Sequence, residues 1–143
     1  FDRNVSWSSR KHYLSSWCSD NCSRGFLIET TESLPDACET WKRLSVLEGL
    51  EPLDATYRTA PFSNNILKLL RPADVICFAS DKLDLDYFHL GLLVKIDGEL
   101  ELFHASKSLG SIAFENLQGF CERTQCSRIS VYRVPIKNDI SSE

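Results

Sequence analysis

The stretch FHLGLLVKIDGELELFHAS, residues 88–106, decides how the second half of this chain folds. Its central pair, Asp97 and Gly98, lies between two apolar runs, which is the strongest short-range sequence signal for a β-hairpin. A two-residue loop at this pair places Ile96 opposite Glu99 and fixes the register of both strands. The sequence therefore predicts an antiparallel hairpin across the whole stretch.

The hairpin brings together two of the three histidines of the chain. In the predicted register Gly91 faces His104 and His89 faces Ser106, and the four positions share one face because side chains alternate along a strand. The two histidines are then diagonal neighbours, about 7–8 Å apart at the backbone. We expect Gly91 to leave space opposite His104. A loop one residue longer would place the two rings on opposite faces.

Two neighbouring imidazoles favour proton transfer near neutral pH. The alternatives are a pair of structural histidines, each hydrogen-bonded to a backbone carbonyl, and a metal site. Zinc takes three or four ligands, and the nearby acidic residues Asp84 and Asp86 precede a strand, where acidic loop residues are ordinary. The pattern therefore favours acid–base chemistry over metal binding.

Length and composition are those of an ordinary globular protein. The 143 residues suffice for one domain with a sizeable core, and 43% of them are hydrophobic and 25% charged. A net charge of −4, with the basic residues scattered, argues against nucleic acid as a partner. No apolar run is long enough to cross a bilayer. We expect a single domain over residues 1–143.

The sulfur-containing residues are unusual. The chain has no methionine, so we expect that Phe1 is not the first translated residue and that a segment upstream has been removed. Of the six cysteines, Cys77 reads as a buried thiol in a strand. Two pairs, Cys18 with Cys22 and Cys121 with Cys126, are close enough for local disulfides in an oxidising compartment. The even number favours a periplasmic or secreted protein, although six free thiols fit equally well.

The remaining patterns predict a helical first half and a cluster of antiparallel strands. Trp17 has helical spacing with its neighbours and is expected in the core, and Gly25 ends that helix. Trp41 is expected to be a core residue of a second helix. The expected elements are a helix within 8–24, helices at 36–50 and 63–72, a loop over 51–61, strands at 26–31, 74–80, 111–116 and 128–135, and one or two helical turns at 116–123. This order predicts an α+β domain with helices packed on one side of an antiparallel sheet.

Several motifs resemble the bacterial N-acetylmuramoyl-L-alanine amidase-like proteins of the NlpC-type cysteine peptidases. In the second half the likeness is carried by residues 73–79, 84–86, 89–92 and 103–106, with Ala73 and Asp84 standing where the family has glycine. In the first half it is carried by Arg10, His12, Tyr13, Trp17, Asp20, Asn21, Gly25 and Thr30. The resemblance covers roughly residues 7–134 as scattered motifs in the right order.

The resemblance implies a papain-like α+β domain that hydrolyses an amide bond with a cysteine and a histidine pair, without cofactor or metal. His89 then corresponds to the base, His104 to the residue that orients it, and peptidoglycan or a related acyl-amide to the substrate. His12, Tyr13 and Ser106 are candidate substrate-binding residues. For the first two, a polar N-terminal helix with a packed tyrosine is the competing interpretation.

The nucleophile is the difficulty, because the family's cysteine belongs upstream of the Arg-x-His-Tyr motif and thus before Phe1. Three explanations remain open. The chain lacks an N-terminal segment of the family's fold, which the intact protein or a second chain supplies. Alternatively, Cys18 has become the nucleophile. Finally, the chain is a catalytically silent relative that binds a peptide or a protein partner in the former cleft.

Overall fold

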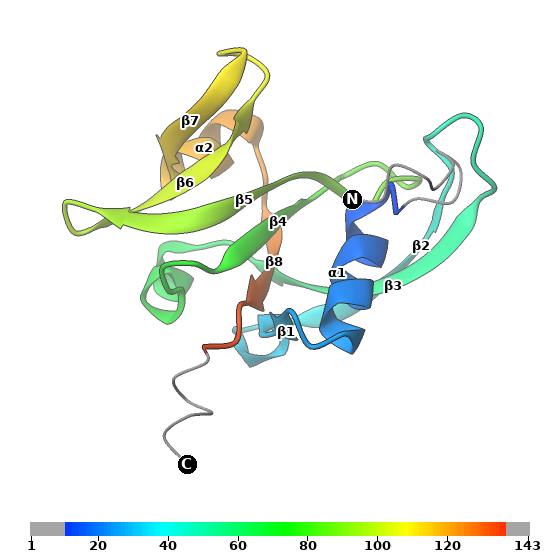
Figure 1. Cartoon of the computed structure of the whole chain (residues 1–143), viewed down its shortest axis with the longest axis horizontal. Helices are drawn as coiled ribbons and strands as arrows, with labels where there is room; N and C mark the ends of the chain where they lie inside the picture. Colours follow the sequence, from blue (N-terminus) through cyan, green and yellow to red (C-terminus); the bar gives the residue numbers. More distant parts are fainter. Residues whose placement is uncertain (1–10, 137–143) are drawn as a thin grey trace.

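The computed structural model describes residues 11–136 and shows one curved sheet with helices on both of its faces (Figure 1). Within these residues eight strands form the sheet. Seven of them follow the order β2-β3-β8-β4-β5-β6-β7, and β1 pairs with the last two residues of β8, while β3 pairs with the first two. All the strand pairs are antiparallel. The strands are β1 (Ile28–Glu29), β2 (Cys38–Leu44), β3 (Leu53–Pro61), β4 (Val75–Ala79), β5 (Tyr87–Ile96), β6 (Glu99–Ser106), β7 (Ser111–Asn116) and β8 (Arg128–Arg133). The α+β class and the antiparallel sheet are confirmed.

The β5–β6 hairpin has the predicted register. Ile96 pairs with Glu99, and the pairing continues without a shift to Leu92 and Phe103. Asp97 and the glycine after it have φ angles of 51° and 83°, which is the left-handed backbone that a two-residue type I′ turn needs. The turn therefore fixes which residues of the two strands share a face.

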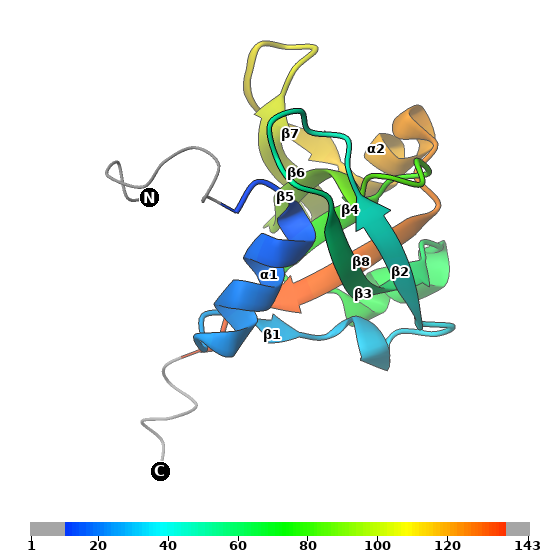
Figure 2. The same ribbon diagram turned by 90° about the vertical axis from the view of Figure 1, so that its right-hand side faces the viewer.

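The sheet separates two apolar clusters, one on each face. Helix α1 (Leu14–Ser23) covers the face that we call the α1 face (Figures 1 and 2). Helix α2 (Leu117–Thr124) and the 3₁₀ helix η3 (Asn64–Leu69) cover the opposite one, the α2 face. Buried side chains of the α1 face include Tyr13, Cys18, Cys77, Tyr87 and Tyr132. Those of the α2 face include Ile76, Phe78, Leu93, Leu102, Phe120 and Val131. The expectation that the helices lie on one side of the sheet was wrong.

The segment 36–61 corrects the sequence prediction most strongly. The expected helix over 36–50 is strand β2, and the expected loop over 51–61 is strand β3, which pairs with β2 over seven residues. Trp41 was read as a core residue of a helix, but in β2 it is 62% exposed because its side chain points away from the buried Leu44. Pro52 precedes β3 and Pro61 is its last residue, so neither proline interrupts the strand.

Candidate active site

The centre of the site is a direct contact between the two histidines of the hairpin. Nε2 of His89 lies 2.8 Å from Nδ1 of His104, and the two rings stand almost perpendicular at 89°. One nitrogen donates and the other accepts. Because this bond occupies Nε2 of His89, the nitrogen left for other chemistry is its Nδ1. The predicted juxtaposition of the two rings is confirmed.

An aromatic side chain of α2 holds both rings in place. Phe120 stacks on His89 with the ring centres 5.3 Å apart and meets the edge of His104 at the same separation. Phe78 of β4 lies 6.1 Å from the His89 ring centre. The two imidazoles therefore project from the α2 face and are fixed by packing as well as by their own hydrogen bond.

The surroundings keep His89 uncharged near neutral pH. Burial lowers the pKa of His89 from its ordinary 6.5, and the neighbouring His104, Arg123 and Lys107 lower it further, while Glu115 raises it. A neutral imidazole can accept a proton, whereas an imidazolium cannot. The environment therefore suits His89 as a base.

Gly91 has a different role from the one expected. A Cβ atom at this position would lie 2.4 Å from Cδ1 of Leu102 and 3.1 Å from the backbone oxygen of Phe103. The space above the glycine is thus filled by a core leucine two residues before His104, and it is not kept open for an imidazole ring. Because Gly91 has no side chain, Leu102 of β6 can pack directly over β5 at this position.

Sequence reasoning missed two charged residues beside the pair. Glu115 of β7 lies 3.4 Å from Nε2 of His104, and Arg123 of α2 binds both carboxylate oxygens of Glu115 at 2.8 Å. The alternation in SIAFEN places Glu115 on one face of its strand, but nothing local to that segment gives the register of β7 against β6. The contact depends on the pairing of Leu102 with Glu115, which the structure supplies.

Asp86, which read as an ordinary loop residue, anchors α1 to the strand that carries His89. Its side chain is fully buried and accepts hydrogen bonds from the backbone N–H of Ser15 at 2.8 Å and of Tyr87 at 2.6 Å. A carboxylate at the first turn of a helix also complements the helix dipole. Asp86 thus fixes the start of β5 against α1, only three residues before His89.

The loop before Asp86 is held from the side by β2. The ammonium group of Lys42 donates to the carbonyl oxygens of Ser80, Lys82 and Leu85 at 2.7–2.9 Å. Partial burial lowers the pKa of Lys42. Three carbonyls on one cation give the 80–86 loop a single fixed conformation, which in turn fixes the entry of the chain into β5.

All six cysteines lie within the described residues and are free thiols. Cys18 is fully buried on the α1 face, where its sulfur lies 3.6 Å from that of Cys77. Cys77 is a buried strand thiol, as expected. Since the imidazoles project from the α2 face, the sheet separates Cys18 from His89. In residues 11–136 no cysteine sulfur makes a hydrogen bond to either histidine.

The three candidate substrate-binding residues lie apart from the pair's hydrogen bond. Tyr13 is 4% exposed, and its hydroxyl accepts from the backbone N–H of Leu47, so it is a core residue of the α1 face. The hydroxyl of Ser106 bonds to Ser108 and accepts from the N–H of Leu109. His12 precedes α1 and is partly buried. Arg10 of the first-half motif lies outside the described residues.

Two cavities of similar size flank the hairpin. An apolar one of about 640 Å³ lies on the α1 face between α1 and the two strands, where Leu14, Leu90 and Phe103 line it together with the exposed Trp17, which was expected in the core. His89 and His104 also border this cavity, but their rings lie against Phe120 on the opposite face.

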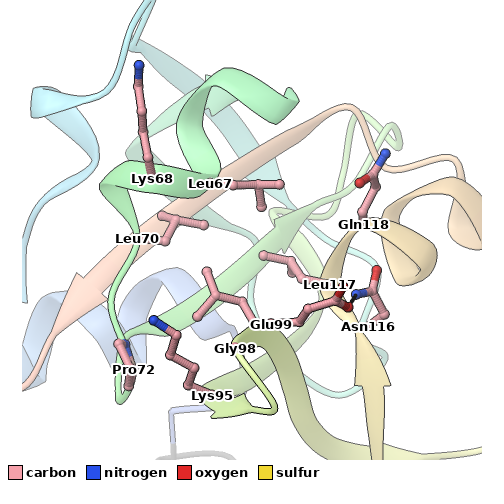
Figure 3. A pocket seen from close by; sticks show the side chains of 11 residues that line it. Leu67, Lys68, Leu70, Pro72, Lys95, Gly98, Glu99, Asn116, Leu117 and Gln118 are labelled. Atoms are coloured by element: carbon pink, nitrogen blue, oxygen red, sulfur yellow. Dashed lines mark hydrogen bonds between the residues drawn. The ribbon is translucent and has the colours of Figure 1, made fainter.

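The second cavity, of about 650 Å³, lies at the turn end of the hairpin between η3 and the start of α2 (Figure 3). Lys68, Lys95 and Glu99 stand around it, and the carboxylate of Glu99 accepts from the amide of Asn116 at 3.4 Å. It has no cysteine or histidine in its lining. The part of the chain that the structure describes contains no cluster of three or more potential metal ligands, and none of its helices is long and apolar enough for a membrane span.

Residues 2–125 match the family described as N-acetylmuramoyl-L-alanine amidase-like, or AmiA-like. The chain belongs to this amidase-like family. No curated protein matches the sequence. The family match covers both halves of the fold, including the histidine hairpin and the whole of α2.

Solved structures share the fold of this amidase-like chain at low sequence identity. A putative xylanase from Bacteroides fragilis and an N-acetylmuramoyl-L-alanine amidase from Bacteroides uniformis are each 20% identical over 92% of the chain, with TM-scores of 0.72. A Legionella pneumophila protein is 19% identical over 93% of the chain, with a TM-score of 0.77. The amidase-like chain spans 69%, 67% and 64% of these three proteins, respectively.

Proposed function

We propose that this protein is a cysteine hydrolase of NlpC type, with a papain-like fold, that cleaves an amide bond in peptidoglycan or a related acyl-amide. The observation that carries the proposal is the 2.8 Å contact between His89 Nε2 and His104 Nδ1. It leaves one nitrogen of His89 for proton transfer and uses the other to fix the orientation of the ring. Membership of the amidase-like family supports amide hydrolysis as the reaction.

In this proposal Nδ1 of His89 takes the proton of a cysteine thiol, and the resulting thiolate attacks the carbonyl carbon of the substrate. The bond between that carbon and nitrogen breaks, and the amine leaves with the proton from His89. Water then hydrolyses the thioester, with His89 again accepting a proton. His104 holds the ring in position through both steps.

We propose that the thiol comes from a segment preceding this chain in the intact protein or from a second chain. The support is geometric, since Cys18 is fully buried on the face of the sheet opposite to the imidazoles.

The test uses the protein encoded by the whole reading frame, incubated with purified peptidoglycan, with released amino groups and muropeptides followed by mass spectrometry. His89→Ala and His104→Ala are expected to lower kcat/KM by about 10²–10⁴, the usual contribution of a positioned general base. His12→Ala removes the third imidazole, a candidate substrate-binding group, without touching the pair, so any effect is expected in KM and not in kcat. Cys18→Ser is expected to retain activity.

Full activity of the His104→Ala variant would refute the role given to the pair. Loss of activity in Cys18→Ser, with its fold intact by circular dichroism, would indicate that Cys18 is the nucleophile. Peptidoglycan that binds to the intact protein without release of amino groups would refute hydrolysis and support a peptide-binding module in its place.

A further inference from the structure

The outer nitrogen of His104 has an unusual environment. The side chain of His104 is 2% exposed, and its Nε2 makes no hydrogen bond within the described residues. A carboxylate oxygen, Oε1 of Glu115, lies 3.4 Å from this nitrogen. Glu115 pairs with Leu102 across the β6–β7 ladder, so its side chain lies on the same face as His104. A buried ring nitrogen therefore has a carboxylate as its neighbour.

A second residue holds that carboxylate in place. The guanidinium of Arg123 donates from Nε and Nη2 to the two oxygens of Glu115, both at 2.8 Å. This bidentate bond is the main reason why the pKa of Glu115 is lowered, and it keeps the carboxylate charged. The same guanidinium lies 5.4 Å above the ring of Phe120, which contacts both histidines. Helix α2 thus fixes the carboxylate and the rings together.

A charged carboxylate decides where the protons of the two rings lie. It can only accept hydrogen bonds, so it favours the form of His104 that carries its proton on Nε2. Nδ1 of His104 then has a lone pair and accepts from Nε2–H of His89. As a result, Nδ1 of His89 is the unprotonated nitrogen. The opposite order of protons would place a lone pair of His104 against the carboxylate.

We propose that Glu115, anchored by Arg123, is a positioning residue that orders the protons along the histidine pair and leaves Nδ1 of His89 as the proton-accepting nitrogen. The role of this proton order in catalysis rests on the proposed function, but the proton order itself does not. The competing interpretation is an ordinary ion pair between β7 and α2, since the Arg123 side chain is 51% exposed. That ion pair would leave the protonation of the histidines unchanged.

The test needs no substrate. Protein labelled with ¹⁵N-histidine is titrated and followed by long-range ¹H–¹⁵N correlation spectra, which report the tautomer and the pKa of each ring, with His12→Gln used for assignment. In the unchanged protein we expect the proton on Nε2 of both rings once they are neutral. The charged groups around His89 are His104, Arg123, Lys107 and Glu115.

Glu115→Gln is expected to give His104 a mixture of tautomers and to lower the pKa of His89, because a favourable negative charge is lost. Arg123→Gln is expected to raise the pKa of His89, because the positive charge nearby is removed, and this variant leaves the β7 residue intact should Glu115→Gln fold poorly. Glu122→Gln is the matched control, as it makes the same charge change on α2 at a residue whose side chain is hydrogen-bonded, among residues 11–136, only to Gln118.

Unchanged tautomers in Glu115→Gln, or the same change in Glu122→Gln, would overturn the proposal. Shifts of the same sign in the Glu115 and Arg123 variants would also overturn it. If the spectra behave as expected while the intact protein releases no amine from peptidoglycan, the proton order stands and the hydrolase function fails.

Discussion

Replacing Gly91 by alanine tests how tightly the histidine hairpin is packed. The added Cβ would lie 2.4 Å from Cδ1 and 2.9 Å from Cγ of Leu102, whereas carbon atoms in contact are about 3.5–4.0 Å apart. Leu102 is fully buried and has little room to move. The third neighbour, the backbone oxygen of Phe103 at 3.1 Å, moves only if β5 and β6 separate. The substitution must therefore shift a core side chain, the backbone or both.

The expected loss of stability follows from two opposing contributions. Extra carbon in a packed core costs about 1–3 kcal/mol. Alanine also restricts the unfolded chain, which offsets about 0.4–1 kcal/mol, because the backbone at Gly91 does not need the left-handed region. Because a contact of 2.4 Å is severe, the cost lies in the upper half of its range, and the net destabilisation is about 1–2 kcal/mol. With a urea m-value of about 2 kcal/mol/M, the unfolding midpoint falls by roughly 0.5–1 M.

The measurement is equilibrium unfolding in urea followed by circular dichroism. Gly119→Ala in α2 is the matched control, because its Cβ would meet nothing closer than 3.8 Å, and we expect it to stabilise the protein by up to about 1 kcal/mol. In a Leu102→Ala background, itself costing about 2–5 kcal/mol, Gly91→Ala should cost almost nothing, since the clashing atoms are gone. The reasoning fails if Gly91→Ala is as stable as the parent, or if it costs the same with and without Leu102.

Three further predictions concern titratable side chains that are buried wholly or in part. Asp86→Ala leaves the N–H of Ser15 without its acceptor, so it should lower the free energy of unfolding in urea by about 1–3 kcal/mol and speed up hydrogen exchange in α1. Unchanged hydrogen exchange in α1 would contradict the anchoring role of Asp86. Because burial lowers the pKa of His89, the unfolded chain binds a proton that the folded chain does not, so the free energy of unfolding should fall as the pH drops below about 6.5. His89→Gln should flatten this pH dependence. An identical pH profile for the variant would disprove the prediction. Asp74→Asn removes a fully buried carboxylate that binds Arg133 at 2.8 and 3.0 Å and should cost about 3–5 kcal/mol, whereas a loss below 1 kcal/mol would show that the pair is not needed.

The histidine hairpin was predictable because its determinants are local. The Asp97-Gly98 turn sets the register, and the register sets which residues share a face. The segment 36–61 was not predictable in this way, because Trp41 and Leu44 have helical spacing while the stability of β2 comes from pairing with β3. Trp17 and Trp41 were wrongly predicted to be buried. A large aromatic side chain is buried only where other elements pack over it, and their packing cannot be read from the local sequence.

The surroundings of the histidines were only partly predictable. Their mutual contact follows from strand alternation, but the position of Glu115 requires the β6–β7 register and that of Phe120 requires the packing of α2 against the sheet. Both are tertiary facts with no local sequence signal. The packing of Leu102 over Gly91 is also a tertiary fact. The strand register shows which residues neighbour the glycine, but it does not show which of their side chains fills the space above it.

The imidazoles, the carboxylate, the guanidinium and the aromatic ring beside them all come from one uninterrupted stretch, residues 89–123. In the proposed function the thiol lies outside this stretch, so inheritance of the histidine pair and its neighbours does not depend on that thiol. Under the same proposal, a descendant that loses its nucleophile would keep the histidine pair, ready for recruitment by a different attacking group or for recognition of the same substrate.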